Sequence, residues 1–536
     1  MPEQTPRFIE NGKRAFAIIT GIFLIAILLV FPIYYRDYYF DILDRKYQFY
    51  YISVIALAGA SLITALAMLV FDLTGYSGKY TAEFLKRFSP RQLRKTLSVT
   101  DWALLAFLLV ALCSTLCSDY LYESFWGNEG RYTGLFLLML YGISFYIISR
   151  LWNFKSIALE IFLVASFLVC AFGITDYFNM DLLGFKRHIN PAQYNIFMSF
   201  MGNINTYTAY ISLVLGVAGA LYGSAKTMGK CLWYYICLVT AMFAIVTGQS
   251  DNAYLALAAM FGLMPFYLFR TRTGIRRYAV ILASFFTVIQ AIDWISQTMG
   301  DKVLSIDGVF SVLVKFGGLA YIVIALWLIV GVLYAHRYFI RKEELAAGKW
   351  PCRIWGGLIA VCIAALVFLL LDANAFGNSD RYGSLGNYLV FGDEWGTHRG
   401  YIWRIGLENY KNFSPIHKIF GYGPDTFGII TVNNNYSEMT SRYGEIFDSA
   451  HNEYLQYFVT IGPLGLLAYL TFLGSAIVRM VRKGIDNPYI MAAVFATICY
   501  GAQAFVNINL PIATPVMWTI LMVGMAGVQV INDREK

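Results

Sequence analysis

Residues 354–371 read IWGGLIAVCIAALVFLLL, an apolar run that contains no charged side chain. A run of about 18–20 apolar residues is long enough to cross the hydrocarbon core of a bilayer as a helix. The chain has about 14 runs of this kind, at 15–35, 50–71, 102–117, 133–149, 156–175, 206–223, 231–247, 253–269, 278–294, 312–334, 354–371, 453–478, 488–505 and 512–530. The sequence therefore predicts an all-α polytopic membrane protein with about 14 transmembrane helices.

The composition agrees with a membrane protein and excludes a single soluble core. Hydrophobic residues make up 58% of the 536 residues and charged residues 14%, whereas a soluble domain carries about 25% charged residues. The net charge of +8 does not indicate a nucleic-acid partner, because most of the basic residues fall in loops that we place in the cytoplasm. We therefore expect no nucleic acid among the partners.

Lysine and arginine gather in four loops between the apolar runs. These loops are 72–100, 270–277, 335–353 and 479–487, and Arg87, Arg341 and Lys342 are among their basic residues. Basic loops face the cytoplasm, and 14 helices with a cytoplasmic N-terminus place all four loops there. We therefore predict a multi-pass protein of the cytoplasmic (inner) membrane with both termini in the cytoplasm. Its parts would be transmembrane helices 1–11 (residues 1–371), a long extracytoplasmic loop (372–452) and helices 12–14 (453–536).

Several arginines fall on the predicted outer side, against the general bias. They are Arg131, Arg187, Arg381, Arg399, Arg404 and Arg442. Each alone is explained by solvent or by a nearby acid, but together they indicate an anion site, because a planar guanidinium donates two hydrogen bonds to a phosphate. If residues 399–412 form a helix, Arg404 pairs with Glu408 in solvent. Arg399 shares another face with Trp403 and is the better candidate for pointing into a pocket.

His451 stands at the end of the outer loop, just before an apolar run. Asp448 or Ser449 is placed to cap the helix that follows, which puts His451 in its first turn. The positive end of a helix dipole lowers a histidine pKa, and a neutral imidazole accepts a proton as a general base. The alternative is an interfacial histidine that bonds to Glu453 or to the loop. Glu453 is itself a candidate base, or the residue that orients His451.

As an ordered set, these residues resemble the O-antigen ligase and O-antigen polymerase (WaaL/Wzy-like) family, in the form found in Gram-positive bacteria. The resemblance is centred on 399–470. It is carried by Arg399-Gly400-Tyr401-Ile402-Trp403, Phe420-Gly421-Tyr422-Gly423-Pro424-Asp425-Thr426-Phe427, Ala450-His451-Asn452-Glu453-Tyr454-Leu455-Gln456 and Gly462-Pro463-Leu464-Gly465-Leu466. Weaker matches are Gly202-Asn203-Ile204-Asn205 and Gly130-Arg131-Tyr132-Thr133-Gly134.

The resemblance implies a membrane glycosyltransferase with a GT-C-like fold. Its donor would be a glycan carried on undecaprenyl diphosphate and used on the outer side of the cytoplasmic membrane, with no metal, nucleotide sugar or other cofactor. By position, Arg399 would bind the carrier diphosphate, and His451 would be the base for the acceptor or lie beside that base. Arg131 and Arg442 are further candidates for binding the diphosphate.

The chain departs from the family after the motif Thr247-Gly248-Gln249-Ser250. Many members have an arginine at the next position, where this chain has Asp251. One phosphate contact of the family is therefore missing here, or it is supplied by Arg187.

The resulting prediction is an inverting transfer, or polymerisation, of a glycan from the lipid carrier onto an acceptor hydroxyl. The outer loop would cover the site and exclude water, with Trp395, Tyr401, Trp403 and Tyr422 in contact with the sugars or the acceptor. The acceptor would be a glycan, a lipid or a protein, with membrane lipid around the site, and ligase and polymerase stay open as alternatives. A transporter or flippase for a lipid-linked glycan is the alternative from another class, and it would favour polar spans and two similar halves.

Overall fold

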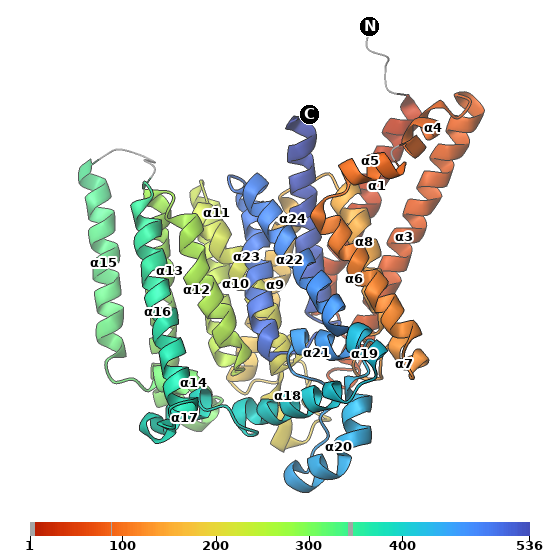
Figure 1. Ribbon diagram of the computed structural model, residues 1–536. Helices are drawn as coiled ribbons and strands as arrows, with labels where there is room; N and C mark the ends of the chain where they lie inside the picture. Colours follow the sequence, from red (N-terminus) through yellow and green to blue (C-terminus); the bar gives the residue numbers. More distant parts are fainter. Residues whose placement is uncertain (1–5, 87, 341–346, 536) are drawn as a thin grey trace.

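The computed structural model describes residues 6–86, 88–340 and 347–535. In this part of the chain the regular elements are helices, apart from one short antiparallel pair of β1 (Phe197–Met198) with β2 (Gly202–Asn203). Figure 1 shows long helices side by side with a layer of shorter helices across one end. Three of the basic residues counted above, Arg87, Arg341 and Lys342, lie outside the described residues. The predicted all-α polytopic fold is confirmed.

Each predicted apolar run contains a helix, although the runs at 312–334 and 453–478 are each divided between two helices. Among the described residues, 12 helical segments are long and apolar enough to cross a membrane. They are α1 (Arg7–Ile25) continued by η1 (Ala26–Val30) and α2 (Phe31–Ile33), α3 (Ile42–Gly75), α6 (Val99–Leu116), α9 (Ile157–Tyr177), α10 (Ile204–Ser224), α11 (Met228–Thr247), α13 (Arg272–Met299), α15 (Leu319–Ile340), α16 (Trp350–Asn374), α22 (Gly462–Gly484), α23 (Pro488–Gln503) and α24 (Thr514–Glu535). The two remaining runs form shorter apolar helices, α8 (Leu135–Leu151) and α12 (Asn252–Leu268). At 1.5 Å per residue these two are about 25 Å long, slightly less than the hydrocarbon core of about 30 Å.

The structure corrects the run predicted at 453–478. It forms two helices, α21 (Glu453–Thr460) and α22, with a break at Gly462, where φ is +80°. A positive φ ends one helix and starts another in a new direction, and glycine adopts it without a Cβ clash. The membrane span therefore begins at Gly462, and α21 belongs to the layer at the end of the bundle.

Helix α10 forms the centre of the bundle. From Thr206 to Gly223 every residue is buried, as expected for a helix that is apolar all round. A Cβ on Gly216 would lie 2.5 Å from the backbone carbon of Phe495 on α23, so this glycine lets the two helix backbones touch. By contrast, α16 exposes large apolar side chains such as Ile354 and Val361. The outer helices thus present the surface that lipid solvates.

The basic loops lie together at one end of the bundle. This end carries α4 (Lys79–Lys86), α5 (Pro90–Thr96) and both termini (Figure 1). The links α12–α13 and α22–α23 also meet there, since Arg270 Nη2 lies 2.9 Å from Asp486 Oδ1. The segment from 375 to 452 lies at the opposite end.

The stretch 372–452, predicted as a polar loop, forms a cap of short helices from residue 375 onward. They are η5 (Ser379–Leu385), α17 (Gly386–Leu389), α18 (Trp395–Lys411), α19 (Pro415–Phe420) and α20 (Phe427–Tyr443). The cap has a hydrophobic core of its own, in which Tyr401, Ile405, Phe427 and Met439 are buried. Its polar side chains are therefore held by a packed unit. The other short elements are α7 (Leu121–Trp126), α14 (Gly308–Val314), η2 (Pro191–Ile196), η3 (Ser199–Met201), η4 (Gly300–Lys302) and η6 (Ala504–Val506).

Two glycines join the cap to the bundle. Gly421 (φ +74°) and Gly462 pass each other backbone to backbone. A Cβ on Gly421 would lie 2.3 Å from the carbonyl carbon of Thr460, and one on Gly462 would lie 2.2 Å from the carbonyl oxygen of Ile419. Gly423 N donates to the Thr460 carbonyl at 2.8 Å next to this crossing. Two of the motifs that carried the family resemblance thus meet at one backbone contact.

We expect Gly421→Ala to destabilise the protein far more than Gly444→Ala. Both glycines have positive φ, +74° and +65°, but a Cβ on Gly444 would meet nothing within 4 Å. The left-handed conformation of Gly444 costs an alanine about 1–2 kcal/mol, whereas the conformation of Gly421, with ψ −176°, is adopted almost only by glycine. The backbone clash at Gly421 adds about 1–3 kcal/mol of overpacking. Thermal unfolding of both variants in detergent measures the difference. Equal losses would show that the crossing carries no packing energy of its own.

Candidate active site

Arg399 is held at the start of the regular part of α18 by a strained turn. Residues 396–398 have φ values of 61°, 58° and 66°, a left-handed conformation that is unfavourable for residues other than glycine. The turn lets Arg399 Nη1 donate to the Gly396 carbonyl at 2.8 Å. It also brings Gly400 against the carbonyl of Gly392, where a Cβ would lie only 1.8 Å from the oxygen. The local strain thus fixes a guanidinium of which only 8% is exposed.

Asp251 is the acidic partner of the buried Arg399. Its Oδ2 lies 3.6 Å from Arg399 Nη1. Burial lowers the pKa of Arg399, and the charge of Asp251 opposes that shift. Within the described part of the chain Arg399 Nε is buried without a hydrogen-bond partner. The guanidinium therefore keeps unused donor capacity, which is what an incoming phosphate needs.

His451 lies outside the helix, immediately before the N-cap residue, and not in the first turn where the sequence predicts it. The helix cap is Asn452, whose Oδ1 accepts from the backbone N–H groups of Tyr454 and Leu455, both at 3.0 Å. The predicted caps, Asp448 and Ser449, are therefore wrong, and His451 precedes the helix with φ +45°.

Trp403 and Gln456 fix the backbone next to His451. Trp403 Nε1 donates to the carbonyl of Ala450 at 2.9 Å, and the N–H of Ala450 donates to Gln456 Oε1 at 2.9 Å. Ala450 itself is fully buried. Two segments of the resemblance, around 399–403 and 450–456, are thus joined by hydrogen bonds that also position His451.

The pKa of His451 is lowered from 6.5 to about 4. Burial is the largest cause, followed by the positive charges of Arg399 and then Arg131, while Asp448 acts in the opposite direction. The sequence also predicts a lowered pKa for His451, but it attributes the shift to the helix dipole. The structure gives burial and two arginines instead, so the neutral imidazole lies within the electrostatic reach of both guanidinium groups.

Arg131 is held near His451 by an ion pair with Asp448. Its guanidinium donates to both carboxylate oxygens of Asp448, at 3.0 Å from Nε and 2.5 Å from Nη2. The side chains of Arg131 and Asp448 are 20% and 52% exposed. Arg131 therefore lies at an open edge of the site, with one carboxylate already bound.

Asp425 anchors the segment that contains Arg131. Its buried carboxylate accepts from the backbone N–H groups of Asn128 at 2.7 Å and Thr133 at 3.2 Å. Burial raises the pKa of Asp425 to about 6, although these hydrogen bonds favour the charged form. Sequence reasoning did not identify this role, because the two segments are 292 and 297 residues apart.

Glu453 follows the cap residue Asn452 and points into a buried polar region. Its Oε1 accepts from Tyr469 at 2.5 Å, and its Oε2 is buried with no hydrogen-bond partner among the residues that the structure describes. Burial raises the pKa of Glu453 to about 7, and the Tyr469 hydrogen bond partly opposes this. The carboxyl group is thus able to hold or release a proton near neutral pH, next to the histidine.

We expect Glu453→Gln to remove part of the pH dependence of stability. The folded-state pKa of about 7 lies above the ordinary 4.5, so the folded protein binds more protons and wild-type stability falls as pH rises from about 4.5 to about 7. Glutamine keeps the shape and an acceptor for Tyr469 but does not ionise. The advantage of the variant should grow by about 3 kcal/mol across that window. Thermal unfolding in detergent between pH 5 and 8 tests this, and parallel profiles would contradict it.

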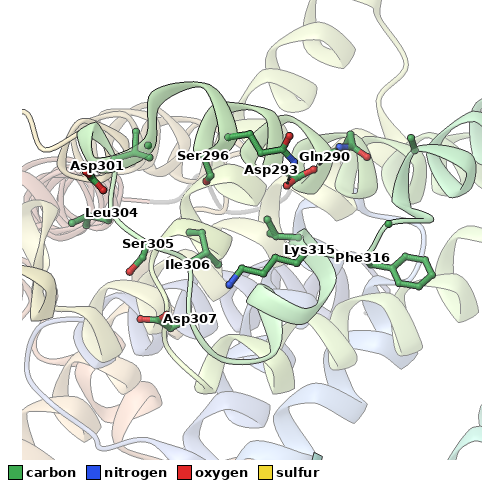
Figure 2. Close-up of a pocket in the computed structure, with 16 residues that line it drawn as sticks. Gln290, Asp293, Ser296, Asp301, Leu304, Ser305, Ile306, Asp307, Lys315 and Phe316 are labelled. Atoms are coloured by element: carbon green, nitrogen blue, oxygen red, sulfur yellow. Dashed lines mark hydrogen bonds between the residues drawn. The ribbon is translucent and has the colours of Figure 1, made fainter. Parts of the chain in front are cut away.

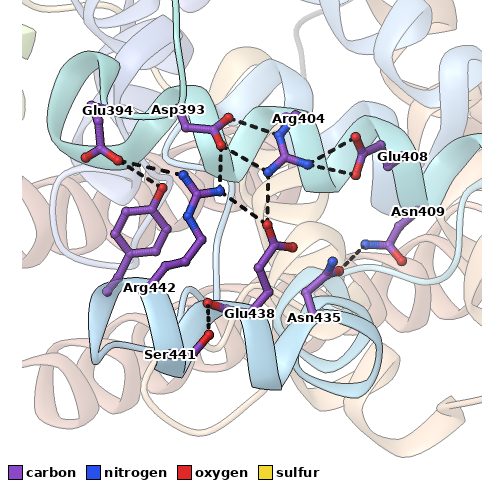
Figure 3. Close-up of polar contacts among 10 residues, drawn as sticks. Asp393, Glu394, Arg404, Glu408, Asn409, Asn435, Glu438, Ser441 and Arg442 are labelled. Carbon is purple, nitrogen blue, oxygen red and sulfur yellow. Dashed lines mark hydrogen bonds and ion pairs between the residues drawn. The ribbon is translucent and has the colours of Figure 1, made fainter.

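Arg442 belongs to a carboxylate network on the cap. Its Nη1 lies 2.8 Å from Asp393 and 3.3 Å from Glu438, and Arg404 binds the same two acids (Figure 3). The predicted Arg404–Glu408 pair is confirmed, at 3.2 Å. Because its guanidinium is neutralised by these acids, we leave Arg442 out of the diphosphate site. Arg187 is exposed on the segment between α9 and α10, over Gly184, and its role stays a prediction.

The four aromatic candidates lie in different surroundings. Trp395 and Trp403 are half-buried and their rings contact each other, with centroids 5.2 Å apart. Tyr422 stacks on His417 and donates to Asp119 at 2.7 Å. Tyr401 is fully buried, and the guanidinium groups of Arg404 and Arg442 lie 5.1 and 5.4 Å from its ring centroid. We therefore leave Tyr401 out of the proposed sugar contacts.

A buried amide network fixes the segment that carries Asp251. Ser250 Oγ donates to Asn205 Oδ1 at 2.5 Å, and Asn252 Nδ2 donates to the Asn205 carbonyl at 2.9 Å. Asn252 also reaches Gln503 Oε1 at 3.3 Å. Asn203 caps α10. Asn205, inside α10, links this helix to Ser250 and Asn252 at the start of α12.

A polar cavity of about 690 Å³ lies near Asp251. It is lined by residues of α13, α14 and their link, including Asp293, Asp307 and Lys315 (Figure 2). The residue after Asp307 is Gly308, where a Cβ would lie 3.7 Å from Asp251 Oδ1. The cavity thus adjoins the segment that contacts the Arg399–Asp251 pair.

Comparison with protein families identifies part of the chain. A family model described as O-Antigen ligase (Wzy_C) matches residues 302–470. The matched segment contains Arg399, His451 and Glu453, whereas Arg131 and Asp251 lie outside it. No curated protein and no solved structure matches the chain. Residues 302–470 therefore belong to the Wzy_C O-antigen ligase domain family, a family of glycosyltransferases, within a polytopic membrane protein.

Proposed function

We propose that the protein transfers a glycan from undecaprenyl diphosphate onto an acceptor hydroxyl. The family match implies a lipid-linked glycan and an acceptor as the two substrates. The observation that carries the finer proposal is that the segments of Arg399 and Arg131 both meet the segment of the half-buried His451, through the Trp403–Ala450 hydrogen bond and the Arg131–Asp448 ion pair. A base and two phosphate-binding groups within electrostatic reach of one another are the parts that such a transfer needs. The likeness to the form of the family found in Gram-positive bacteria stays a prediction.

In the proposed step, the acceptor hydroxyl oxygen attacks the anomeric carbon of the donor sugar. The bond from that carbon to the diphosphate oxygen breaks, and the leaving diphosphate takes the electron pair. His451 Nε2 or Nδ1 takes the hydroxyl proton. Arg399 stabilises the charge that develops on the diphosphate, and Arg131 supports it from the open edge. A single displacement of this kind inverts the anomeric carbon.

We propose further that the cap faces the outside of the cytoplasmic membrane. The support is the common end shared by the basic loops and the termini, since basic loops face the cytoplasm. The site lies at the opposite end, where the proposed lipid carrier would enter from the side of the bundle. The half-buried rings of Trp395 and Trp403 are the proposed sugar contacts, as aromatic faces pack on apolar surfaces of ligands.

A transfer assay in detergent tests the proposed function. Purified full-length protein is mixed with an undecaprenyl-diphosphate-linked glycan and candidate acceptors, without a membrane barrier. We expect glycan on the acceptor with inverted anomeric configuration, and release of undecaprenyl diphosphate. Serial addition to a carrier-linked acceptor identifies a polymerase, and one addition to another molecule identifies a ligase. If the protein moves the intact donor across vesicles and catalyses no transfer in detergent, the proposal is wrong.

A further inference from the structure

Arg399 is a buried cation whose only nearby carboxylate contact in the described structure is a loose one. A guanidinium that is 92% buried is unfavourable without an opposite charge. Asp251 supplies that charge at 3.6 Å, beyond a normal hydrogen bond. Arg399 Nε, on the same group, has no partner among the described residues. Asp251 is therefore close enough to balance the charge of the guanidinium but too far away to accept a normal hydrogen bond from it.

The backbone that carries Asp251 is itself held in place. Ser250 and Asn252, on either side of it, are bound to Asn205 by the amide network. Oδ1 of Asp251 lies near Gly308, 3.7 Å from where a Cβ would stand. The network therefore keeps Asp251 beside Arg399, and its side chain is 35% exposed.

We propose that Asp251 is a positioning residue that serves as the resident counter-ion of Arg399 and competes with the donor diphosphate for it. The inference rests on the proposed role of Arg399 in binding the diphosphate. In the empty site Asp251 stabilises the buried guanidinium. In the loaded site the same charge repels the diphosphate, so that affinity is limited and the lipid diphosphate product is released readily.

Two kinetic consequences follow for Asp251→Asn. Removing the fixed negative charge should tighten binding of a diphosphate by about tenfold, because like charges near a shared cation repel. The KM for the lipid-linked donor should fall. The kcat should fall as well, because the diphosphate product leaves more slowly. A merely structural role for Asp251 would not produce lower KM together with lower kcat.

Inorganic pyrophosphate is the probe for a direct test, since it carries neither sugar nor lipid. Its binding to full-length protein in detergent is measured by calorimetry for the wild type, Asp251→Asn, Asp251→Glu and the same changes in an Arg399→Gln background. We expect tighter binding for Asp251→Asn and binding within about threefold of wild type for Asp251→Glu, which keeps the charge. In the Arg399→Gln background the gain from Asp251→Asn should be much smaller, because no cation is left for which Asp251 and pyrophosphate compete.

The outcomes separate this inference from the proposed function. Binding that depends on Arg399 but is unchanged or weakened by Asp251→Asn overturns the counter-ion role and leaves the proposed function standing. Binding that does not depend on Arg399, or no binding by any variant, overturns both the role of Arg399 and the inference. If Asp251→Asn fails to fold alone, pyrophosphate should restore its folding by replacing the lost charge, and failure to do so also overturns the inference.

Discussion

His451→Asn should lower the turnover of glycan transfer by about 10²–10⁴-fold, the contribution typical of a general base. Asparagine is the right replacement because His451 has φ +45°, a conformation that asparagine tolerates better than alanine. A loss of rate in this variant therefore reports the missing base rather than a strained backbone. Thermal unfolding in detergent should show a change of less than about 1 kcal/mol.

The pH profile of the wild type adds a second expectation. The pKa of His451 is lowered to about 4 by burial and by Arg399 and Arg131, so the imidazole is neutral at all pH values well above 4. As the pH is lowered from about 6 to about 5, protonation of His451 should not change the rate. Below about pH 5 the rate should fall, because the base becomes protonated. Steady-state rates across pH 4–8 test this. A fall in rate centred near pH 6.5 would instead show that the imidazole titrates as an ordinary exposed histidine.

His398→Asn is the matched control for the base. His398 lies on the same cap, also has positive φ (66°), and pairs with Glu394 at 3.0 Å. Although His398 precedes Arg399 in the chain, its imidazole contacts Glu394, Tyr443 and Phe447 on the cap. Asparagine tolerates the left-handed backbone of the turn, so the rate should stay within about threefold of wild type. If both asparagine variants lose activity equally, the backbone and not the base is responsible. If His451→Asn keeps the rate, Glu453 becomes the proposed base.

The helices of the bundle are predictable because their signal is local. A run such as 354–371 must be a helix in lipid, since only internal hydrogen bonds satisfy its backbone there. The break at Gly462 is different. Its cause is the carbonyl of Ile419, 2.2 Å from where a Cβ would stand, and no local pattern reveals a contact with another segment. Apolar residues on both sides of the break therefore suggested one continuous helix.

The same division between local signals and contacts with distant segments applies to the site. His451 and Arg399 are candidates from the sequence because unusual residue types stand just before an apolar run and at a helix start. Their partners were not found. Asp448 meets Arg131 across 317 residues, and Asp251 meets Arg399 from another helix. Pairings of this kind depend on packing, as does the burial that removes Tyr401 from the surface. Sequence alone gives the chemistry of single residues here, and the fold decides which of them act together.

Arg399→Lys should lower kcat/KM for the lipid-linked donor by about 10²–10³-fold, the loss expected when a preorganised donor to a developing charge is removed. Lysine keeps the positive charge that Asp251 needs, so the fold keeps its ion pair. It loses the planar fork, and with it Nε and the second terminal nitrogen that bind a phosphate side by side. The change thus separates charge from geometry, which Arg399→Ala does not, because alanine leaves Asp251 without its cation.

Arg404→Lys, five residues further along α18, is the control for the same chemical change. Arg404 binds Asp393, Glu408 and Glu438 at 2.9–3.2 Å on the partly exposed side of the cap, and exposed pairs contribute about 1 kcal/mol or less. Its kcat/KM should stay within about threefold of wild type. If lysine at 399 is as harmless as lysine at 404, the guanidinium of Arg399 makes no bidentate contact with the donor. The phosphate-binding role would then pass to Arg131. Its guanidinium could exchange Asp448 for a phosphate, because Asp448 is half exposed.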